Sequence, residues 1–270
     1  MYENPITQRN METLRSFGMT IVEPGDGHLA CGDDGKGRLP DPPVLKEAVI
    51  RALVPKDLEG VHVLLTAGPT CEAIDPVRFI TNHSSGKMGY QTALAALRRG
   101  AKVTLVSGPV NLPCPDGAKL VPVTSAQEML EAVLAHADSA DIIIKTAAVA
   151  DYTPADPADH KVKKKDGDLS LPLRRTTDIL ATLGGQKKEG QVLVGFSMET
   201  DDLLKNSTAK LEKKNADMIV ANSLRTPGAG FGVETNIATF ITRQGAEEQP
   251  CMTKYELGNL ILTRANSMRG

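Results

Sequence analysis

The chain has few aromatic residues: no tryptophan, four tyrosines and five phenylalanines among 270 residues. Proteins that bind single-stranded nucleic acids stack the bases on aromatic side chains, which are scarce here. Its charge is also unsuited to nucleic acid, because 31 Lys and Arg against 33 Asp and Glu give a net charge of −2 without a polybasic surface. We therefore expect no nucleic-acid partner.

Cysteines and long apolar runs are scarce as well. Cys31, Cys71, Cys114 and Cys251 lie tens of residues apart, without a CxxC pair or a secretory leader, so neither a zinc site nor a disulfide framework is indicated. The longest apolar runs, such as residues 141–150, are shorter than the ~18 residues that a membrane helix needs. We expect a cytoplasmic protein in a reducing compartment, with no membrane partner.

Residues 1–57 are polar and rich in turns. An amphipathic stretch at 7–17 and a strand-like run at 19–22 precede five glycines between positions 25 and 37. This is too little apolar material for an independent core, since domains below about 40 to 60 residues usually need help to fold. We expect a small irregular N-terminal segment.

Residues 58–270 have a different pattern, in which continuous apolar strands alternate with helices. That alternation is typical of a mainly parallel sheet covered on both faces. We predict strands at 61–66, 102–107, 141–146, 192–197, 218–221 and 238–242, and helices at 90–99, 126–137, 202–215 and 254–264, with a glycine-rich loop at 228–232. The fold class is therefore α/β, a Rossmann-like doubly wound fold, which binds ligands at the carboxyl ends of its strands.

The usual nucleotide signatures of this fold class are missing. The turn after the first strand reads Ala67-Gly68-Pro69-Thr70 rather than G-x-G-x-x-G, and Ser107 ends the second strand where NAD enzymes place an acid. No P-loop pattern occurs either. A dinucleotide dehydrogenase and a P-loop enzyme are both disfavoured.

A segment rich in small residues stands ahead of the helix predicted at 90–99. Ser84, Ser85, Gly86 and Gly89 let backbone N–H groups approach an anion closely, and a helix dipole favours negative charge at that end. Phosphate is the natural ligand. A capped helix whose glycine packs on the sheet explains the same spacing equally well.

Charged residues follow two of the later strands. Asp151 comes after the strand at 141–146, and a lysine run starts at Lys161; this pair suits a metal-bound polyphosphate. Lys210 and Lys214, four residues apart, share one face of a helix. Each of these groups also fits a solvated loop or helix face, and the spacing alone leaves both readings open.

Taken together, these segments resemble the bacterial phosphopantothenate–cysteine ligase family. The resemblance runs from about residue 61 to residue 262. It rests on these stretches, in order: T-A-G-P-T, D-P-V-R-F-I-T-N-H-S-S-G-K-M-G, V-T-L-V-S-G-P-V, A-A-V-A-D-Y, K-V-K-K, V-G-F-S-M-E-T and D-M-I-V-A-N.

The resemblance implies a reaction and a set of site residues. Members join 4′-phosphopantothenate to L-cysteine, cleaving CTP to CMP and diphosphate through an acyl-cytidylate, with Mg²⁺. It implies Asn82 and Lys161 as catalytic residues, Asp151 as the residue near the metal, and Arg78, Asn82 and Ala148 as contacts of the acid substrate. The CTP contacts implied are Ser84, Ser85, Gly86, Lys145, Thr146, Ala147, Asp151, Lys161, Thr177, Asp178, Ile179, Leu180, Phe196, Lys210 and Lys214.

The N-terminal segment carries a second resemblance. Residues 1–5 and 30–38 are similar to the carboxyl-terminal end of the flavin-dependent phosphopantothenoylcysteine decarboxylase, in which Cys31 matches a catalytic position on a flap. The FMN site of that family lies in an earlier portion, so we expect no decarboxylase activity from this chain alone. We accordingly expect a decarboxylase remnant at 1–57 and a ligase domain at 58–270; a truncation, a split gene and a degenerate remnant all stay open.

Two rival functions remain. An NADP-type reductase on the same fold is disfavoured by the missing glycine pattern, and a non-catalytic nucleotide-binding assembly module does not require an acyl-holding amide beside a polyphosphate clamp. The resemblance also implies a homodimer, and a separate decarboxylase polypeptide is a possible partner.

Overall fold

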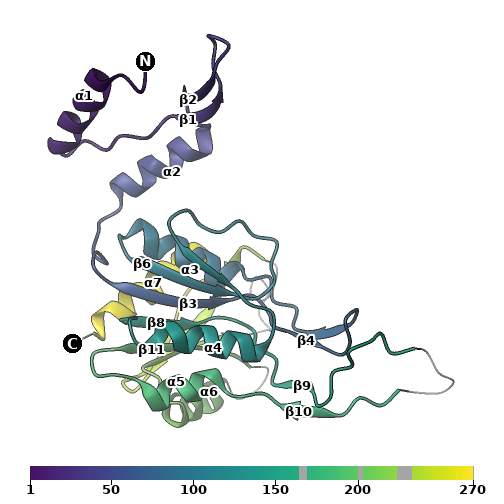
Figure 1. Cartoon of the computed structure of the whole chain (residues 1–270). Coiled ribbons are helices and arrows are strands. Elements are labelled where there is room, and N and C mark those ends of the chain that lie inside the picture. The colour runs from purple at the N-terminus through teal and green to yellow at the C-terminus, as the bar shows by residue number, and fades with distance from the viewer. Residues whose placement is uncertain (164–168, 200–202, 224–232, 270) are drawn as a thin grey trace. The chain divides into compact units, whose positions relative to one another are not determined.

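The computed structural model describes residues 1–163, 169–199, 203–223 and 233–269. The chain divides into two compact units, Met1–Lys56 and Asp57–Gly270, which are described separately (Figure 1).

The first unit consists of two helices and a hairpin. Helix α1 (Pro5–Ser16) precedes strands β1 (Gly25–His28) and β2 (Asp34–Arg38), which pair antiparallel, and helix α2 (Pro42–Leu53) follows. None of residues 1–56 is buried, as the small apolar content predicts.

The strand predicted at 19–22 is wrong. These residues form no ladder, and Met19 is exposed. The hairpin forms instead in the glycine-rich stretch, where Gly27 and Gly32 adopt positive φ, a conformation that glycine reaches at little cost. The helix α2 was not predicted, although Pro42 at its first position is a typical helix start.

The second unit is built on a large sheet. Among the described residues it has eight strands in the order β15-β14-β12-β11-β8-β3-β6-β7. Strands β12 through β7 are parallel to their neighbours, and β14 and β15 add antiparallel pairs at one edge. Their bounds are β3 (His62–Ala67), β6 (Lys102–Ser107), β7 (Lys119–Pro122), β8 (Ile142–Lys145), β11 (Val192–Glu199), β12 (Met218–Ser223), β14 (Ala238–Thr242) and β15 (Gly245–Glu248).

Helices cover both faces of this sheet (Figure 1). Helices α3 (Lys87–Arg98) and α7 (Lys254–Ser267) pack on one face, where Val63 and Leu65 point. Helices α4 (Ala126–Ala137), α5 (Ile179–Gln186) and α6 (Leu203–Lys213) contribute to the other core, which contains Leu64. Because successive side chains of a strand point to opposite faces, the side chains of β3 contribute alternately to the two apolar cores.

Short strands lie outside the large sheet. Strands β4 (Cys71–Ala73) and β5 (Phe79–Thr81) form one antiparallel pair, and β9 (Tyr152–Pro154) and β10 (Leu173–Arg175) form another. Figure 1 shows that β4, β9 and β10 extend away from the sheet. A third pair joins β13 (Thr235–Asn236) to β16 (Met252–Thr253). None of these pairs was predicted, because strands of two or three residues carry little periodicity.

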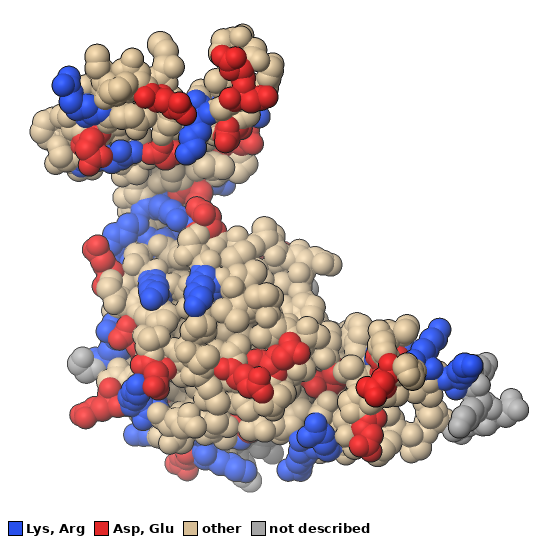
Figure 2. All heavy atoms as spheres, viewed as in Figure 1, with Lys and Arg blue, Asp and Glu red and all other residues tan. Residues whose placement is uncertain are grey.

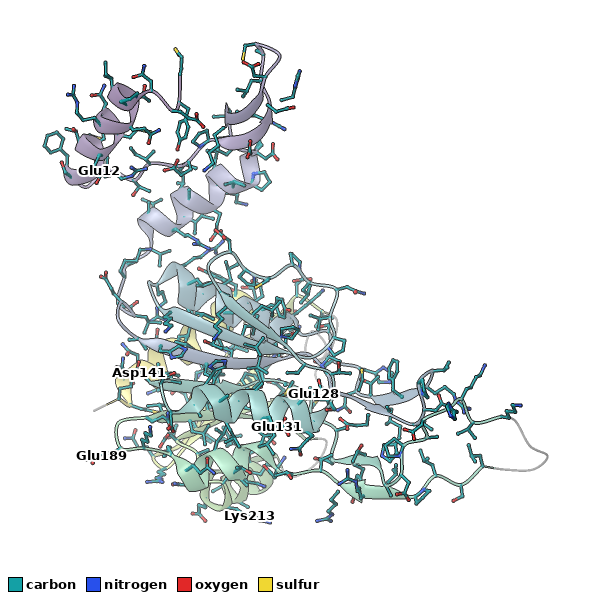
Figure 3. The ribbon with its side chains drawn as sticks, viewed as in Figure 1. Glu12, Glu128, Glu131, Asp141, Glu189 and Lys213 are labelled. Atoms are coloured by element: carbon teal, nitrogen blue, oxygen red, sulfur yellow. The ribbon has the colours of Figure 1, made fainter. Side chains whose placement is uncertain are left out.

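Polar contacts fix the amino edge of the sheet. The carboxylate of Asp141, labelled in Figure 3, accepts the His62 backbone N–H at 2.7 Å and so ties the start of β8 to β3. Arg99 is buried and donates to both carboxylate oxygens of Asp57, at 2.6 and 2.9 Å. A hydrogen bond to Asp141 and the Arg99–Asp57 ion pair therefore stabilise this edge of the sheet.

The Rossmann-like fold predicted from sequence is confirmed. The helix at 126–137 has its predicted bounds, whereas α3 begins at Lys87, three residues before the prediction. The glycine-rich loop predicted at 228–232 lies outside the described residues. Both signs of charge are interspersed on the face in Figure 2, and within the described ranges we find no helix long and apolar enough to cross a bilayer.

Candidate active site

A cavity of about 460 Å³ opens at the carboxyl edge of the sheet. Its walls come from the segment before α3, the segment after β8, the ends of β11 and β12, strand β13 and the first residue of α7. The cavity includes the point where β3 and β8 are neighbours in the sheet. The next strand of the large sheet after β3 along the chain is β6, which lies on the opposite side of β3. Ligands of doubly wound sheets bind at such switch points.

Ten of the predicted site residues line this cavity. They are Asn82, Ser84, Ser85, Gly86, Lys145, Thr146, Ala147, Ala148, Asp151 and Phe196. They come from three strand ends and one helix start, so the fold brings together residues up to 114 positions apart, from Asn82 to Phe196.

The structure confirms one interpretation of the segment before α3, a capped helix whose glycine packs on the sheet, and anion binding at this helix start stays a prediction. Gly86 caps α3 with φ of 76°, a left-handed conformation in which a side chain is strained. Gly89 packs on the sheet: a Cβ there would lie 2.6 Å from both Ala67 Cβ and Thr146 Oγ1. The helix start is therefore seated on the ends of β3 and β8, and its first residues line the cavity.

Hydrogen bonds hold the backbone after β8 in place. Ala148 N donates to Gly68 O at 2.9 Å, and Thr70 N donates to Ala148 O at 3.2 Å. The same Ala148 carbonyl accepts the Asn82 side-chain amide at 2.9 Å. Asn82 is thus oriented by a rigid segment of backbone, although its side chain is exposed.

Charged groups gather at one end of the cavity. Lys145 is half-buried, and burial lowers the pKa of its ammonium, an effect that Lys214 and Lys210 increase and Asp178 and Asp151 oppose. Lys214 pairs with Asp178, and Lys210 Nζ donates to Ser197 Oγ at 3.1 Å. Three lysines lie here with the two carboxylates of Asp178 and Asp151, so the net charge at this end is positive and suits an anionic ligand such as a polyphosphate.

Sequence reasoning missed several residues that line the cavity. Lys87 and Lys254 are the first residues of α3 and α7, and Asn222 and Asn236 are nearly buried. A lysine at a helix N-terminus is unfavourable because the helix dipole is positive there. This unfavourable placement of two lysines was the feature of the sequence that could have indicated a site.

Several predicted residues do not line the cavity. Lys161 is exposed, Thr177 lies in another depression beside Arg174, and Ile179 and Leu180 are buried in the core under α5. Lys210 and Lys214 are also not among the lining residues, although Lys210 donates to Ser197 at the cavity wall. Asp178 caps that helix by accepting the Ala181 N–H at 2.9 Å. Within the part of the chain that the structure describes, the turn at 177–180 joins the lysine cluster through Asp178, which pairs with Lys214.

Arg78 is held at a distance from the cavity walls by Asp75. The buried Asp75 carboxylate accepts Arg78 Nη2 at 2.6 Å and the Val162 N–H at 3.1 Å, while Arg78 Nη2 donates to Val162 O at 3.1 Å. This clip fixes the backbone next to Lys161 against the β4–β5 hairpin. Asp75 was not predicted as a site residue.

We expect an Asp75→Asn variant to lose stability in a pH-dependent way. The Arg78 guanidinium holds the pKa of Asp75 well below its ordinary value of 3.8, so the folded state favours the carboxylate. The stabilisation is fully present above about pH 4 and is lost as pH falls through the folded pKa. Urea denaturation should give a lower midpoint for the variant than for the wild type at pH 7. The difference between the two midpoints should narrow toward pH 3. A difference independent of pH would contradict this account.

The described residues contain no group of three His, Cys, Asp or Glu side chains that could hold a metal ion alone. Mg²⁺, however, is commonly held by one or two carboxylates together with substrate phosphates. Asp151 at the cavity wall fits that mode. All four cysteines are free thiols, and Cys31 lies exposed in the turn between β1 and β2.

Comparisons with known proteins identify the families that this chain matches. Residues 58–268 match the family described as the DNA/pantothenate metabolism flavoprotein C-terminal domain, and residues 1–54 match the family described as Flavoprotein. The coenzyme A biosynthesis bifunctional protein CoaBC of Bacillus subtilis (strain 168) is 51% identical over 267 residues, which cover 97% of this chain and 66% of that protein.

Two further similarities extend the comparison. A cysteine/cysteine sulfinic acid decarboxylase from an unknown prokaryotic organism is 49% identical, over 90% of this chain and 69% of that protein. The crystal structure of the C-terminal domain of a coenzyme A biosynthesis bifunctional protein CoaBC superposes with a TM-score of 0.67 at 46% identity, covering 78% of this chain and 96% of that one. The chain spans about two thirds of the length of these full-length relatives.

Proposed function

This chain belongs to the family of DNA/pantothenate metabolism flavoprotein C-terminal domains, and from that premise we propose that it is a cytoplasmic ligase of coenzyme A biosynthesis. It joins 4′-phosphopantothenate to L-cysteine and cleaves CTP to CMP and diphosphate through an acyl-cytidylate. The observation that carries the proposal is the cavity, whose walls include Asn82, Lys145 and Asp151.

The first half-reaction joins two anions. A carboxylate oxygen of the acid attacks the α-phosphorus of CTP, the bond to the β-phosphate bridging oxygen breaks, and diphosphate leaves with the electron pair. Lys145, Lys210 and Lys214 supply fixed positive charge for the polyphosphate, which lowers the repulsion before the bond forms. Mg²⁺, when bound through Asp151 and the phosphates, would supply further charge neutralisation.

The second half-reaction forms the amide. The cysteine amine attacks the acyl carbonyl, the bond to the CMP oxygen breaks, and the amine loses a proton as CMP leaves. The Asn82 amide donates without adding a charge that would compete for the lysines, and its hydrogen bond to Ala148 O fixes its direction. No covalent enzyme nucleophile is required, so Cys71 and Cys114 have no assigned role.

The N-terminal unit is related to flavin-dependent enzymes, which suggests a second activity coupled to the ligase. Residues 1–54 match the Flavoprotein family, and Cys31 is the residue that would serve decarboxylation. None of residues 1–56 is buried. We therefore assign decarboxylation and FMN binding to this unit together with further flavoprotein residues, which belong either to the same polypeptide or to a separate one. Homodimerisation of the ligase domain stays a prediction.

The experiment that tests the proposed function separates the nucleotides. The purified chain is incubated with 4′-phosphopantothenate, L-cysteine, Mg²⁺ and either CTP or ATP, and the monophosphate is identified. CMP formed only when both the acid and cysteine are present supports the ligase. Oxidation of NADPH without CMP would favour a reductase, and nucleotide binding without turnover would favour a non-catalytic module.

A Lys210→Met variant is expected to raise the KM for CTP by about tenfold, since loss of one charge-assisted contact costs about 1.5 to 3 kcal/mol before solvent replaces part of it. The KM for 4′-phosphopantothenate should change by less than about twofold. Initial rates of CMP release at varied CTP measure both values. The matched control is Lys213→Met on the same helix, since Lys213, labelled in Figure 3, is exposed, whereas Lys210 donates to Ser197 at the cavity wall. An equal rise for both variants would contradict the assignment of Lys210.

A further inference from the structure

We propose that Gly184 and Asn215 are positioning residues for the nucleotide site: they seat the end of α6 on α5 and so fix the positions of Lys214 and Lys210. Neither Gly184 nor Asn215 is among the residues that line the cavity. The inference rests on the proposed function in one respect, which is the assignment of the two lysines to the polyphosphate of CTP.

Helix α6 ends in a motif that requires an unusual backbone conformation. Asn215 N donates to Glu212 O at 3.1 Å. Ala216 N donates to Leu211 O, also at 3.1 Å, and this pair of bonds closes a helix that is followed by a left-handed residue. Asn215 supplies that conformation with φ of 47°, and it is the one non-glycine residue with positive φ in the part of the chain that the structure describes. The chain therefore leaves α6 at a fixed point, immediately after Lys214.

The end of α6 lies directly on α5 at Gly184. A Cβ at Gly184 would lie 1.8 Å from Lys214 O and 3.3 Å from Asn215 Cβ. The Asn215 side chain completes the junction, because its Nδ2 donates to Gly184 O at 2.9 Å. Glycine is required here, since the Lys214 carbonyl occupies the space that any side chain would need.

The packing of α5 leaves it no room to move aside. Leu180, one turn before Gly184, lies against Gly195 of β11, where a Cβ would come within 2.6 Å of Leu180 Cδ2. Lys187, just beyond the helix, pairs with Asp217 at 2.7 Å. Packed interiors have little free volume, so a side chain at Gly184 would displace the end of α6 rather than α5.

This junction sets the positions of two lysines at the end of α6. Lys214 Nζ pairs with Asp178, which caps the start of α5. Lys210, one turn earlier, donates from Nζ to Ser197 Oγ at the cavity wall, at 3.1 Å. Residues four positions apart share one helix face, so a displacement of α6 moves both ammonium groups together.

A purely structural role of the junction makes a different prediction. If the junction only stabilised the fold, its substitution would lower the free energy of unfolding without changing the affinity of the folded protein for nucleotide. A positioning role predicts weaker binding of polyphosphate by a folded variant. The KM for the acid should change little, because Asn82 takes its direction from Ala148 O rather than from α5 or α6.

The first test compares neighbouring glycines of one helix. Gly184→Ala is expected to raise the Kd for CTP with Mg²⁺ about tenfold, comparable with the loss of one charged contact, while the KM for 4′-phosphopantothenate changes by less than about twofold. Gly185→Ala is the matched control, since a Cβ there meets no atom within 4 Å, and it should bind CTP as the wild type does. Calorimetric titration of the whole chain with CTP and with inorganic tripolyphosphate measures binding without turnover.

The second test compares two substitutions at the end of α6. Asn215→Gly and Asn215→Ala both lose the hydrogen bond to Gly184 O, but only glycine reaches positive φ without strain. Asn215→Ala should therefore raise the Kd for CTP about threefold more than Asn215→Gly does, because part of the strain is relieved by displacement of the helix end.

The outcomes separate the positioning role from the proposed function. Urea midpoints identify a Gly184→Ala protein that fails to fold, in which case the two Asn215 variants decide. Unchanged Kd values in folded variants would overturn the positioning role, and the ligase would stand if the wild type releases CMP. If the wild type binds both probes but releases no CMP, the ligase fails, while tenfold weaker binding by Gly184→Ala still supports the positioning role. A wild-type chain that binds neither probe would overturn both.

Discussion

An Asn82→Ala variant is expected to lose ligation by about 10²- to 10³-fold in kcat, the effect of removing one donor that stabilises developing charge. Its free energy of unfolding should fall by no more than about 1 kcal/mol, because the side chain is exposed and makes one hydrogen bond, to Ala148 O. The measurement pairs CMP release at saturating substrates with urea denaturation of the same preparation.

The control for this variant is Asn111→Ala, an exposed asparagine that does not line the cavity. It should retain wild-type turnover. Near-normal product formation by Asn82→Ala would remove Asn82 from the mechanism. A large loss of stability without a specific loss of turnover would make it a structural residue.

A Gly89→Val variant is expected to lower the free energy of unfolding by about 3 kcal/mol, at the upper end of the usual cost of overpacking. A Cβ at this position already lies 2.6 Å from Ala67 Cβ and Thr146 Oγ1, so a branched side chain must displace α3 from the ends of β3 and β8. Because the start of α3 lines the cavity, affinity for CTP should fall as well. Thermal unfolding and nucleotide titration measure the two effects.

Gly185→Ala provides the contrast, because a Cβ there meets no atom within 4 Å and the residue lies in α5. Alanine in place of an unhindered helical glycine should leave stability equal or raise it by up to about 1 kcal/mol. Equal stability losses in both variants would show that contact with the sheet is not the reason Gly89 matters.

Much of the large unit was predictable because its central strands β3 and β8 are almost entirely buried. Residues 62–67 and 142–144 are buried without interruption, and continuous apolar runs between helices indicate parallel strands. The strand at 19–22 was mispredicted for the opposite reason: an apolar run of four residues means little when nothing pairs with it. The hairpin at Gly25–Arg38 is stabilised by turn geometry, which apolar periodicity does not report.

The candidate site was predictable only in part. Asp151 follows the strand predicted at 141–146, so its place at the carboxyl edge follows from the fold class, whereas Asn82 and Lys145 were assigned from the family resemblance. Lys254 could not be placed beside Lys87 from sequence, since that requires knowing that α7 packs on α3. Asp75 was hidden because its role depends on Val162, a partner 87 positions away.

The distribution of the cavity residues along the chain has a consequence for synthesis. The walls begin at Asn82 and are completed by Lys254, the first residue of the last helix. During vectorial synthesis the amino-terminal strands leave the ribosome long before α7 does. In a nascent chain, Lys145 and the lysines near it are therefore synthesised before the walls of the cavity are complete. Productive binding of substrate requires that the whole domain has folded.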